Sequence, residues 1–250
     1  MKPLAGDEGA NAMLARPMRE PWGVAPGGTR SIIMSCELNS IRAGAAALAI
    51  CLLGAGLLMA EEGFEPLFNG KNLDDWDVGT ASAWQVRDGV IIGKTPGLKY
   101  NEFLRTKKHY SDFVLKATMR IIGGKGNSGI QFRSKPVPDS HEVSGYQADA
   151  GTRANGEPIW GVLYDECRRK VQLAAPPRSV LDQFDPKEWH EYVITAQGNR
   201  IRLEVDGVTT VDYEEKEPGI EQTGFIALQA HSHPGPIEVH FKDLWIKEPR

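Results

Sequence analysis

The stretch Gly126-Asn127-Ser128-Gly129-Ile130-Gln131-Phe132-Arg133 has the pattern of a β-strand that begins beside a glycine-rich turn. Apolar and polar side chains alternate through its second half. Because successive side chains of a strand point to opposite faces of the sheet, Ile130 and Phe132 are expected on one face. Gln131 and Arg133 then fall on the other face. The stretch therefore predicts a strand with one apolar face toward a core and one polar face.

Two later stretches show the same alternation. Gln147 and Asp149 share a face in one of them, and Gln229 and His231 share a face in the other. A solvated face of an antiparallel sheet would explain any one of these strands. If all three strands lie in one sheet, however, its polar face carries an Arg, an Asp, a His and three Gln, rather than the Lys, Glu and Thr of an ordinary solvated face. Such side chains are suited to hydrogen-bonding a ligand that is rich in hydroxyl groups.

The composition is that of a globular protein without a basic surface. The chain has 250 residues, of which 41% are hydrophobic and 25% charged, and its net charge is -4. Nucleic-acid binding generally needs a positive field, so no nucleic-acid partner is expected. Cys36 and Cys51 precede the predicted strands, which leaves Cys167 as the single cysteine of the strand-rich part. A disulfide within that part, or a zinc site made of cysteines, is therefore excluded.

The N-terminal quarter of the chain differs from the rest. Residues 1–33 are rich in Gly, Pro, Ala and charged residues without periodicity, which predicts disorder, or an extension upstream of a true start at Met34. Residues 34–60 contain a positive residue, an apolar run and a small residue before two glutamates, as a secretory signal peptide does. Because that run is short and rich in Gly and Ala, no stable membrane span is expected after processing. Export to the periplasm or the outside is predicted, with residues 61–250 as one domain.

From Phe64 to the end, the chain has the pattern of short strands joined by turns. Apolar and β-branched runs alternate with turn dipeptides, and no window of helical length shows a 3.6-residue period. Asp206-Gly207 between two such runs is a strong signal of a β-hairpin. The predicted fold class is all-β, a sandwich or a barrel.

Six motifs, in order along the chain, resemble the 3-keto-disaccharide hydrolase family. They are Phe68–Trp76, Trp84–Ile91, Tyr110–Phe113, Gly126–Arg133, Trp189–Tyr192 and Ile226–His231. The resemblance spans residues 64–248 and implies a jelly-roll sandwich of two antiparallel sheets, similar to concanavalin A-like lectins and glucanases. It also implies an exported bacterial enzyme that acts on oxidised sugars. Many members carry a Glu where this chain has Tyr146, so residue roles from other branches do not transfer directly.

The resemblance implies a 3-keto-glycoside or oligosaccharide as substrate, and the ketone determines the chemistry. It acidifies the proton at C2, so a base can form an enolate that expels the oxygen from C1, and water then adds to the product. Arg133 is the expected stabiliser of the enolate. His231 or Asp149 is the expected base, and either one could orient the other. Tyr164 is the expected proton donor to the leaving group.

The remaining predicted site residues contact the substrate. They are Gln131, Gln147, Trp160, Glu166 and Gln229. Trp160 could stack on a sugar ring or anchor a loop, and the sequence does not decide between these roles. No cofactor is assigned: His231 and His233 are too few ligands to establish a site, and a divalent metal stays an open alternative.

The predicted chemistry needs a source of the 3-keto group, which implies a sugar 3-oxidoreductase in the same pathway. Two other functions remain open for the same fold. The first is a non-catalytic carbohydrate-binding module, which would use the same side chains for hydrogen bonds alone. The second is a laminin-G-like adhesion domain.

Overall fold

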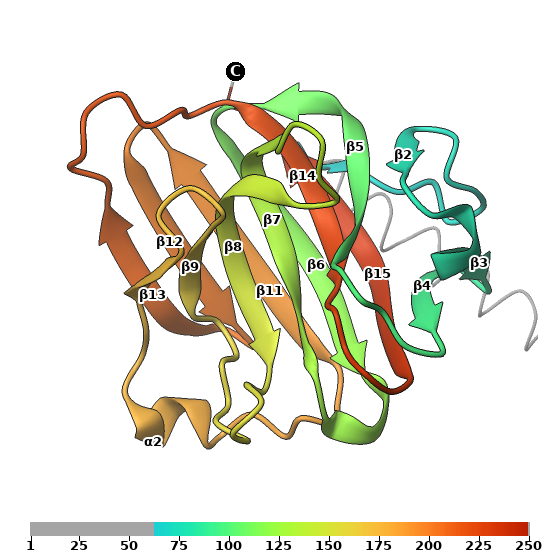
Figure 1. Ribbon diagram of the computed structural model, residues 1–250. Coiled ribbons are helices and arrows are strands. Elements are labelled where there is room, and N and C mark those ends of the chain that lie inside the picture. Colours follow the sequence, from blue (N-terminus) through green and yellow to red (C-terminus); the bar gives the residue numbers. More distant parts are fainter. Residues whose placement is uncertain (1–62, 250) are drawn as a thin grey trace, which may run out of the picture. The chain divides into compact units, whose positions relative to one another are not determined.

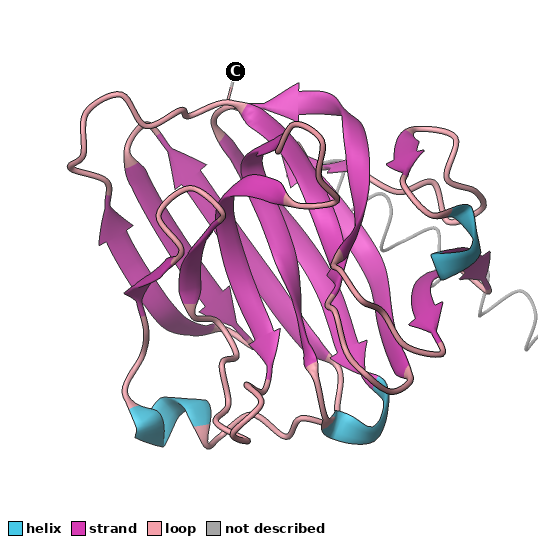
Figure 2. Cartoon of the chain, viewed as in Figure 1, coloured by secondary structure: helices cyan, strands magenta, loops and turns pink. Residues whose placement is uncertain are grey.

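The computed structural model describes residues 63–249, and they form two antiparallel β-sheets (Figures 1 and 2). This confirms the predicted all-β jelly-roll sandwich. The predicted segments 1–33 and 34–60 lie outside the described residues. Within residues 63–249, no helix is long and apolar enough to cross a membrane.

The first sheet has eight strands. They are β1 Glu65–Pro66, β3 Trp84–Arg87, β4 Val90–Thr95, β6 Phe113–Ile121, β11 His190–Gln197, β12 Arg200–Val205, β13 Val208–Glu214 and β15 Ile237–Lys247. Their order across the sheet is β13-β12-β11-β6-β15-β4-β3, and β1 pairs with β15. Asp206 and Gly207 join β12 to β13 with positive φ angles of 50° and 76°, which confirms the predicted hairpin.

The second sheet has seven strands. They are β2 Trp76–Val78, β5 Glu102–Tyr110, β7 Asn127–Pro136, β8 Val143–Gly151, β9 Leu163–Glu166, β10 Val171–Ala174 and β14 Gly224–Ala230. Their order is β10-β9-β8-β7-β14-β5-β2. The three strands singled out in the sequence are thus the neighbours β8, β7 and β14 of one sheet, as predicted (Figure 1).

Helical structure among the described residues is limited to short segments. The two 3-10 turns are η1 Ala81–Ala83 and η2 Ile122–Gly124, and the α-helical turn is α2 Arg178–Leu181. The two 3-10 turns adjoin strands and α2 lies in the β10–β11 connection, and their shortness agrees with the absence of a helical period in the sequence.

The apolar faces of the two sheets share one core. In β6 of the first sheet every second residue is buried, as the alternation of its sequence requires. Phe113 of this strand meets Phe132 of the second sheet edge to face, with ring centroids 6.1 Å apart. Ile130, Phe132, Ala148 and Leu228 all lie in this core, which confirms their predicted direction.

Three loops next to the second sheet are fastened to one another through Asn101, in the β4–β5 loop. Its side-chain amide donates to Glu142 Oε2 at 2.9 Å, and its Oδ1 accepts from the backbone N–H of Ser232 at 2.8 Å. Backbone hydrogen bonds in both directions between Leu98 and His233 reinforce the link. The loops that precede β8 and β15 are therefore held in fixed positions beside the polar face.

Candidate functional site

A pocket of about 240 Å³ opens where β8 and β9 meet the loops at the end of the polar face. The residues that line it are Asn127, Gln147, Asp149, Arg153, Ile159, Tyr164, Glu166 and His231. Strand register explains much of this set: Gln147 of β8 lies opposite Tyr164 of β9, and Gly145 lies opposite Glu166. Side chains with the same parity on adjacent strands therefore project together.

The pocket contains five of the nine predicted site residues. They are Gln147, Asp149, Tyr164, Glu166 and His231. Gln131 and Gln229 belong to the same face but are fully buried and do not line the pocket. Gln131 donates a hydrogen bond to Gln147. The side-chain amide of Gln229 has no hydrogen-bond partner among the described residues.

Arg133 lies outside the pocket, and the prediction that it shares a face with Gln147 is wrong. A β-bulge interrupts the pairing of β7 with β8 after Phe132, and Arg133 has a positive φ of 48°. Its guanidinium, 2% exposed, donates to the backbone oxygens of Ser111 and Gly198 at 2.8 and 2.7 Å and pairs with Asp112 at 3.0 Å. Arg133 therefore ties the second sheet to turns of the first and cannot reach a ligand in the pocket.

Trp160 also lies outside the pocket, so it is not available to stack on a sugar there. It is fully buried in the core, and its ring centroid lies 4.4 Å from that of His190. The side chain of Trp160 instead anchors its loop on the sandwich, which is the other role considered for it in the sequence. The sequence could not separate these roles, because both place a tryptophan in a loop beside a strand.

Asp149 is held by a chain of hydrogen bonds that starts at the bulge. Ser134 Oγ donates to Gln131 Oε1 at 2.7 Å, Gln131 Nε2 donates to Gln147 Oε1 at 2.8 Å, and Gln147 Nε2 donates to Asp149 Oδ1 at 2.7 Å. Gly129, opposite Asp149, leaves room for this chain, since a Cβ there would lie 2.8 Å from Gln147 Cγ. The carboxyl group is thereby fixed in place at the floor of the pocket.

The electrostatics of the pocket suit proton transfer near neutral pH. Burial raises the pKa of Asp149 to about 7, and the charge of Glu166 adds to the rise, while the hydrogen bond from Gln147 and the charge of Arg153 oppose it. Burial also raises the pKa of Glu166, with a contribution from Glu142. Burial and the two nearby carboxylates raise the pKa of Tyr164, so that this phenol keeps its proton.

His231 lines the pocket and has one ring nitrogen without a hydrogen-bond partner among the described residues. Its Nδ1 lies 2.7 Å from the backbone oxygen of Ser232. A carbonyl oxygen only accepts hydrogen bonds, so Nδ1 carries the proton in the neutral ring and Nε2 keeps a free lone pair. His231 can therefore accept a hydrogen bond from a ligand.

The pocket also contains residues that sequence reasoning missed, and Arg153 is the most consequential of them. It lies in the β8–β9 loop, where its backbone N–H bonds Glu157 O and its carbonyl accepts from Gly156. It supplies the guanidinium that had been expected from Arg133. The signal in the sequence was the glycine-bounded loop Gly151–Gly156 directly after Asp149, because such loops carry functional side chains on rigid scaffolds.

A family comparison bears on what this pocket does. The sequence profile of the 3-keto-alpha-glucoside-1,2-lyase-like domain matches residues 63–247. The chain belongs to this family. The resemblance inferred from six motifs is thereby confirmed, and the chain is a carbohydrate-active protein.

Solved structures share the fold of this lyase-like domain at low sequence identity. A Parabacteroides distasonis protein, provisionally assigned as a glycosyl hydrolase, is 21% identical over 76% of this chain and 96% of its own, with a TM-score of 0.56. The carbohydrate-binding module CBM66 of Bacillus subtilis is 17% identical over 71% and 98%, with a TM-score of 0.52. The β-glucanase of Bacillus licheniformis is 14% identical over 75% and 97%, with a TM-score of 0.50. No match was found among curated proteins.

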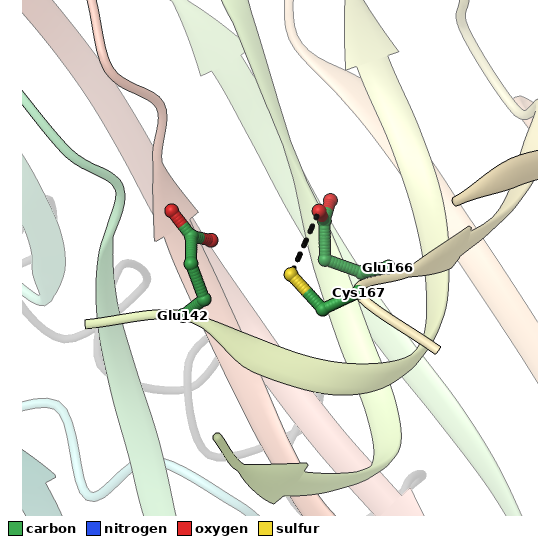
Figure 3. Close-up of side chains that lie close together, drawn as sticks. All are labelled: Glu142, Glu166 and Cys167. Carbon is green, nitrogen blue, oxygen red and sulfur yellow. Dashed lines mark hydrogen bonds between the residues drawn. The ribbon is translucent and has the colours of Figure 1, made fainter. Parts of the chain in front are cut away.

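One group of side chains in the described part of the lyase-like domain could be considered for a metal ion. Ligand atoms of Glu142, Glu166 and Cys167 lie within 4.8 Å of one another, and the Cys167 thiol donates to Glu166 Oε1 at 3.7 Å (Figure 3). Burial raises the pKa of Cys167 to about 11, and Glu166 adds to this rise. Metals bind the thiolate, so an ion held by this group would have to displace the proton of the Cys167 thiol.

Proposed function

We propose that the protein cleaves the glycosidic bond of 3-keto-glycosides by elimination followed by hydration. The observation that carries the proposal is Asp149, a buried carboxyl group with a pKa of about 7 at the floor of a pocket that also holds a guanidinium and a phenol. A general base works best when its pKa lies near the working pH. Membership of the 3-keto-alpha-glucoside-1,2-lyase-like family supports this reaction class.

In this mechanism Asp149 removes the proton from C2 of the sugar ring. The electrons of the C2–H bond move to the ketone, which becomes an enolate with its negative charge on the C3 oxygen. Gln147 holds the carboxylate of Asp149 in position through the 2.7 Å hydrogen bond. The ketone makes the step feasible, because the C2 proton of an unoxidised sugar is far too weakly acidic for a carboxylate base.

Arg153 stabilises the negative charge on the C3 oxygen. A fixed positive group at a developing oxyanion is commonly the largest contribution to catalysis. Nη2 of Arg153 donates a hydrogen bond to Gln172 Oε1 on β10 at 2.5 Å. This contact directs the guanidinium from the β8–β9 loop toward β10. His231 Nε2 accepts a hydrogen bond from a hydroxyl group of the same sugar.

Collapse of the enolate breaks the bond between C1 and the glycosidic oxygen. The C3 ketone re-forms, a double bond forms between C1 and C2, and Tyr164 gives its proton to the departing oxygen. Water then adds across the double bond, with hydroxide at C1 and a proton at C2. Asp149 returns the proton to C2 and Tyr164 recovers its own from the water, so the net reaction is hydrolysis.

Two further parts of the proposal concern the cell. The substrate must be oxidised at C3 before this protein acts, so a sugar 3-oxidoreductase supplies it. The signal-peptide pattern of residues 34–60 supports a reaction outside the cytoplasm, in the periplasm or beyond.

The experiment incubates the purified full-length protein with a 3-keto-glucoside and, separately, with the same unoxidised glucoside. We expect release of the aglycone from the keto-sugar alone. Cleavage of the unoxidised glucoside would instead indicate an ordinary glycosidase in which Asp149 and Glu166 act as a carboxylate pair. Binding of plain oligosaccharides without turnover, also after addition of divalent metals, would show a carbohydrate-binding module.

A further inference from the structure

A second hollow, of about 800 Å³, adjoins the catalytic pocket. Three loops form it: the turn between β6 and β7, the β8–β9 loop and the β14–β15 loop. Asn127, Arg153 and His231 line both the hollow and the pocket. A substrate whose sugar ring occupies the pocket can therefore extend its leaving group into the hollow.

Small residues keep the hollow open on the side of the loops. They are Gly124, Gly126, Ala154 and Gly156. A Cβ at Gly156 would meet no atom within 4 Å, so no neighbouring side chain fills the space there. Gly124 and Gly126 have positive φ angles of 68° and 114°, and they turn the β6–β7 backbone to form the rim.

The charged side chains that line the hollow are of one sign. Among its described lining residues the charged side chains are Lys125 and Arg153, and there is no Asp or Glu, although the whole chain has a net charge of -4. The adjoining pocket differs, because it contains Asp149 and Glu166. The hollow is thus a positive region beside a pocket that carries carboxyl groups.

The positive groups are available to a ligand. Among the described residues, no carboxylate forms an ion pair with Lys125. Arg153 Nε lies 3.7 Å from Glu157 Oε2, but their side chains are 39% and 44% exposed, so water weakens this pair. Glu157 does not line the hollow. A carboxylate that enters the hollow can therefore interact with both Lys125 and Arg153.

We propose that this hollow binds the leaving group of the substrate and favours one that carries a carboxylate. The assignment to a leaving group rests on the proposed function. Either a sugar acid or an aromatic acid would supply this chemistry, because both offer a carboxylate some distance from the glycosidic oxygen. Specificity then arises from Lys125, which touches no reacting atom, with Arg153 at the boundary between the hollow and the pocket.

A matched pair of substrates tests the preference. The 4-carboxyphenyl and 4-carbamoylphenyl 3-keto-glucosides have the same shape and differ by one charge. We expect kcat/KM to be about five- to tenfold higher for the carboxylate at low salt, as two partly exposed ion pairs would produce. The advantage should shrink as salt is added, since exposed charges are screened. A 3-keto-glucoside of a uronic acid, compared with its methyl ester, shows whether a sugar acid is also preferred.

Variants of Lys125 assign the effect to the hollow. Lys125→Ala should reduce the ratio of the two kcat/KM values, and Lys125→Glu should bring it to one or below. The control is Lys135→Ala, which removes another exposed lysine. Lys135 lies near the far end of β7 and pairs with Glu221 in the loop before β14. This control should leave the ratio unchanged.

The proposal is overturned if the wild-type ratio equals one, or if Lys125→Glu leaves the preference intact. If neither aryl glycoside is cleaved, the proposed function fails instead. The hollow is then tested by calorimetric binding of 4-hydroxybenzoate against 4-hydroxybenzamide to the full-length protein. Tighter binding of the benzoate that Lys125→Glu abolishes supports the hollow, and equal affinities exclude it.

Discussion

At the scale of single residues, the pocket depends on a carboxyl group that would be more stable in water. Asp149 is 5% exposed, with its Oδ1 bonded by Gln147 and its backbone oxygen bonded by the Tyr192 hydroxyl at 2.8 Å. Burial of a charge that is only partly compensated raises its pKa and lowers the stability of the fold. Such a conflict between stability and function is common at active sites.

The first prediction concerns Asp149→Asn. The folded pKa of about 7 exceeds the unfolded model value of 3.8, so between these values the folded state binds an additional proton. The contribution of Asp149 to the free energy of unfolding of the wild type therefore falls as pH rises from about 4 to about 7, and then levels off. Because asparagine does not ionise, the variant should lose this contribution. Its melting temperature should match that of the wild type near pH 4 and exceed it near pH 8, by an amount equivalent to roughly 2–4 kcal/mol.

The same variant should lose turnover by about a hundredfold or more, the usual contribution of a general base. A scan of melting temperature against pH and a rate assay on the 3-keto-glucoside provide the two measurements. An equal pH dependence in both proteins would show that Asp149 is ionised at neutral pH in the folded state.

The second prediction separates the two arginines. Arg153→Ala should lower kcat on the 3-keto-glucoside about a hundredfold, the effect of removing one oxyanion donor. KM should change much less, since the interaction strengthens in the transition state. Arg178→Ala removes an exposed arginine outside the pocket, paired with Asp182 at 2.7 Å, and serves as the control. Equal losses of affinity and rate in Arg153→Ala would assign Arg153 to substrate positioning instead.

At the scale of elements, the β-bulge in β7 decides which side chains reach the polar face. In a regular strand Arg133 would follow Gln131 on that face, with Ser134 on the other. The bulge instead directs Arg133 toward the first sheet and gives Ser134 the contact with Gln131. Gly145 and Gly224 accommodate it, since a Cβ at either would lie less than 2.5 Å from an atom of Ser134. The extra residue of the bulge thus puts the hydroxyl group of Ser134 beside Gln131, where a regular strand would put the guanidinium of Arg133.

The third prediction follows from the bulge. Arg133→Ala should lower the free energy of unfolding by roughly 3 kcal/mol, because it leaves Asp112 and two backbone oxygens without their buried donor. Urea unfolding measures this loss. Below the unfolding transition, kcat should stay within about threefold of the wild type, since a structural residue distant from the pocket affects stability rather than the chemical step. A large loss of kcat in a fully folded variant would show that Arg133 acts on the pocket after all.

At the scale of the whole domain, stability comes from the core that both sheets share. Phe132 is fully buried between Phe113 and Tyr146, with ring centroids 6.1 and 5.6 Å away. Tyr146 in turn donates from its hydroxyl to Glu215 Oε2 at 2.7 Å. Phe132 and Tyr146 are the sequence neighbours of Gln131 and Gln147. They pack the core-facing side of the same strands that carry the site.

The fourth prediction is that Phe132→Ala lowers the free energy of unfolding by about 3–5 kcal/mol, the usual cost of a large cavity in a core. Phe132→Leu should cost considerably less, because it retains most of the apolar volume. Chemical denaturation of both variants provides the measurement. A cost below about 1 kcal/mol for the alanine variant would contradict the packing described for this site.

The fifth prediction concerns export of the whole chain. The protein recovered from outside the cytoplasm should begin near Glu61, because the apolar run ends in the small residue Ala60 that signal peptidases favour. N-terminal sequencing of the secreted protein checks this. Recovery of the complete chain from the cytoplasm alone would contradict it.

The sequence by itself determined the fold class, the shared sheet and the direction of most side chains. Period-two alternation and turn dipeptides are local properties, and they placed Ile130, Leu228 and Gln147 on the correct faces. The ordered motifs also identified the family. A regular strand alternates the direction of its side chains, so these features can be predicted without knowing which distant residues come into contact.

Only the tertiary structure decided which of those side chains meet a ligand. The bulge at Arg133 depends on glycines of two neighbouring strands, and the burial of Trp160 depends on His190 from the opposite sheet. Arg153 enters the pocket through a loop whose course follows no strand parity. The pKa of Asp149 likewise reflects burial, which the folded sheet imposes, and the charges of Glu166 on β9 and Arg153 in the β8–β9 loop. Each of these depends on how strands and loops pack in three dimensions, and the local alternation of residues carries no information about that packing.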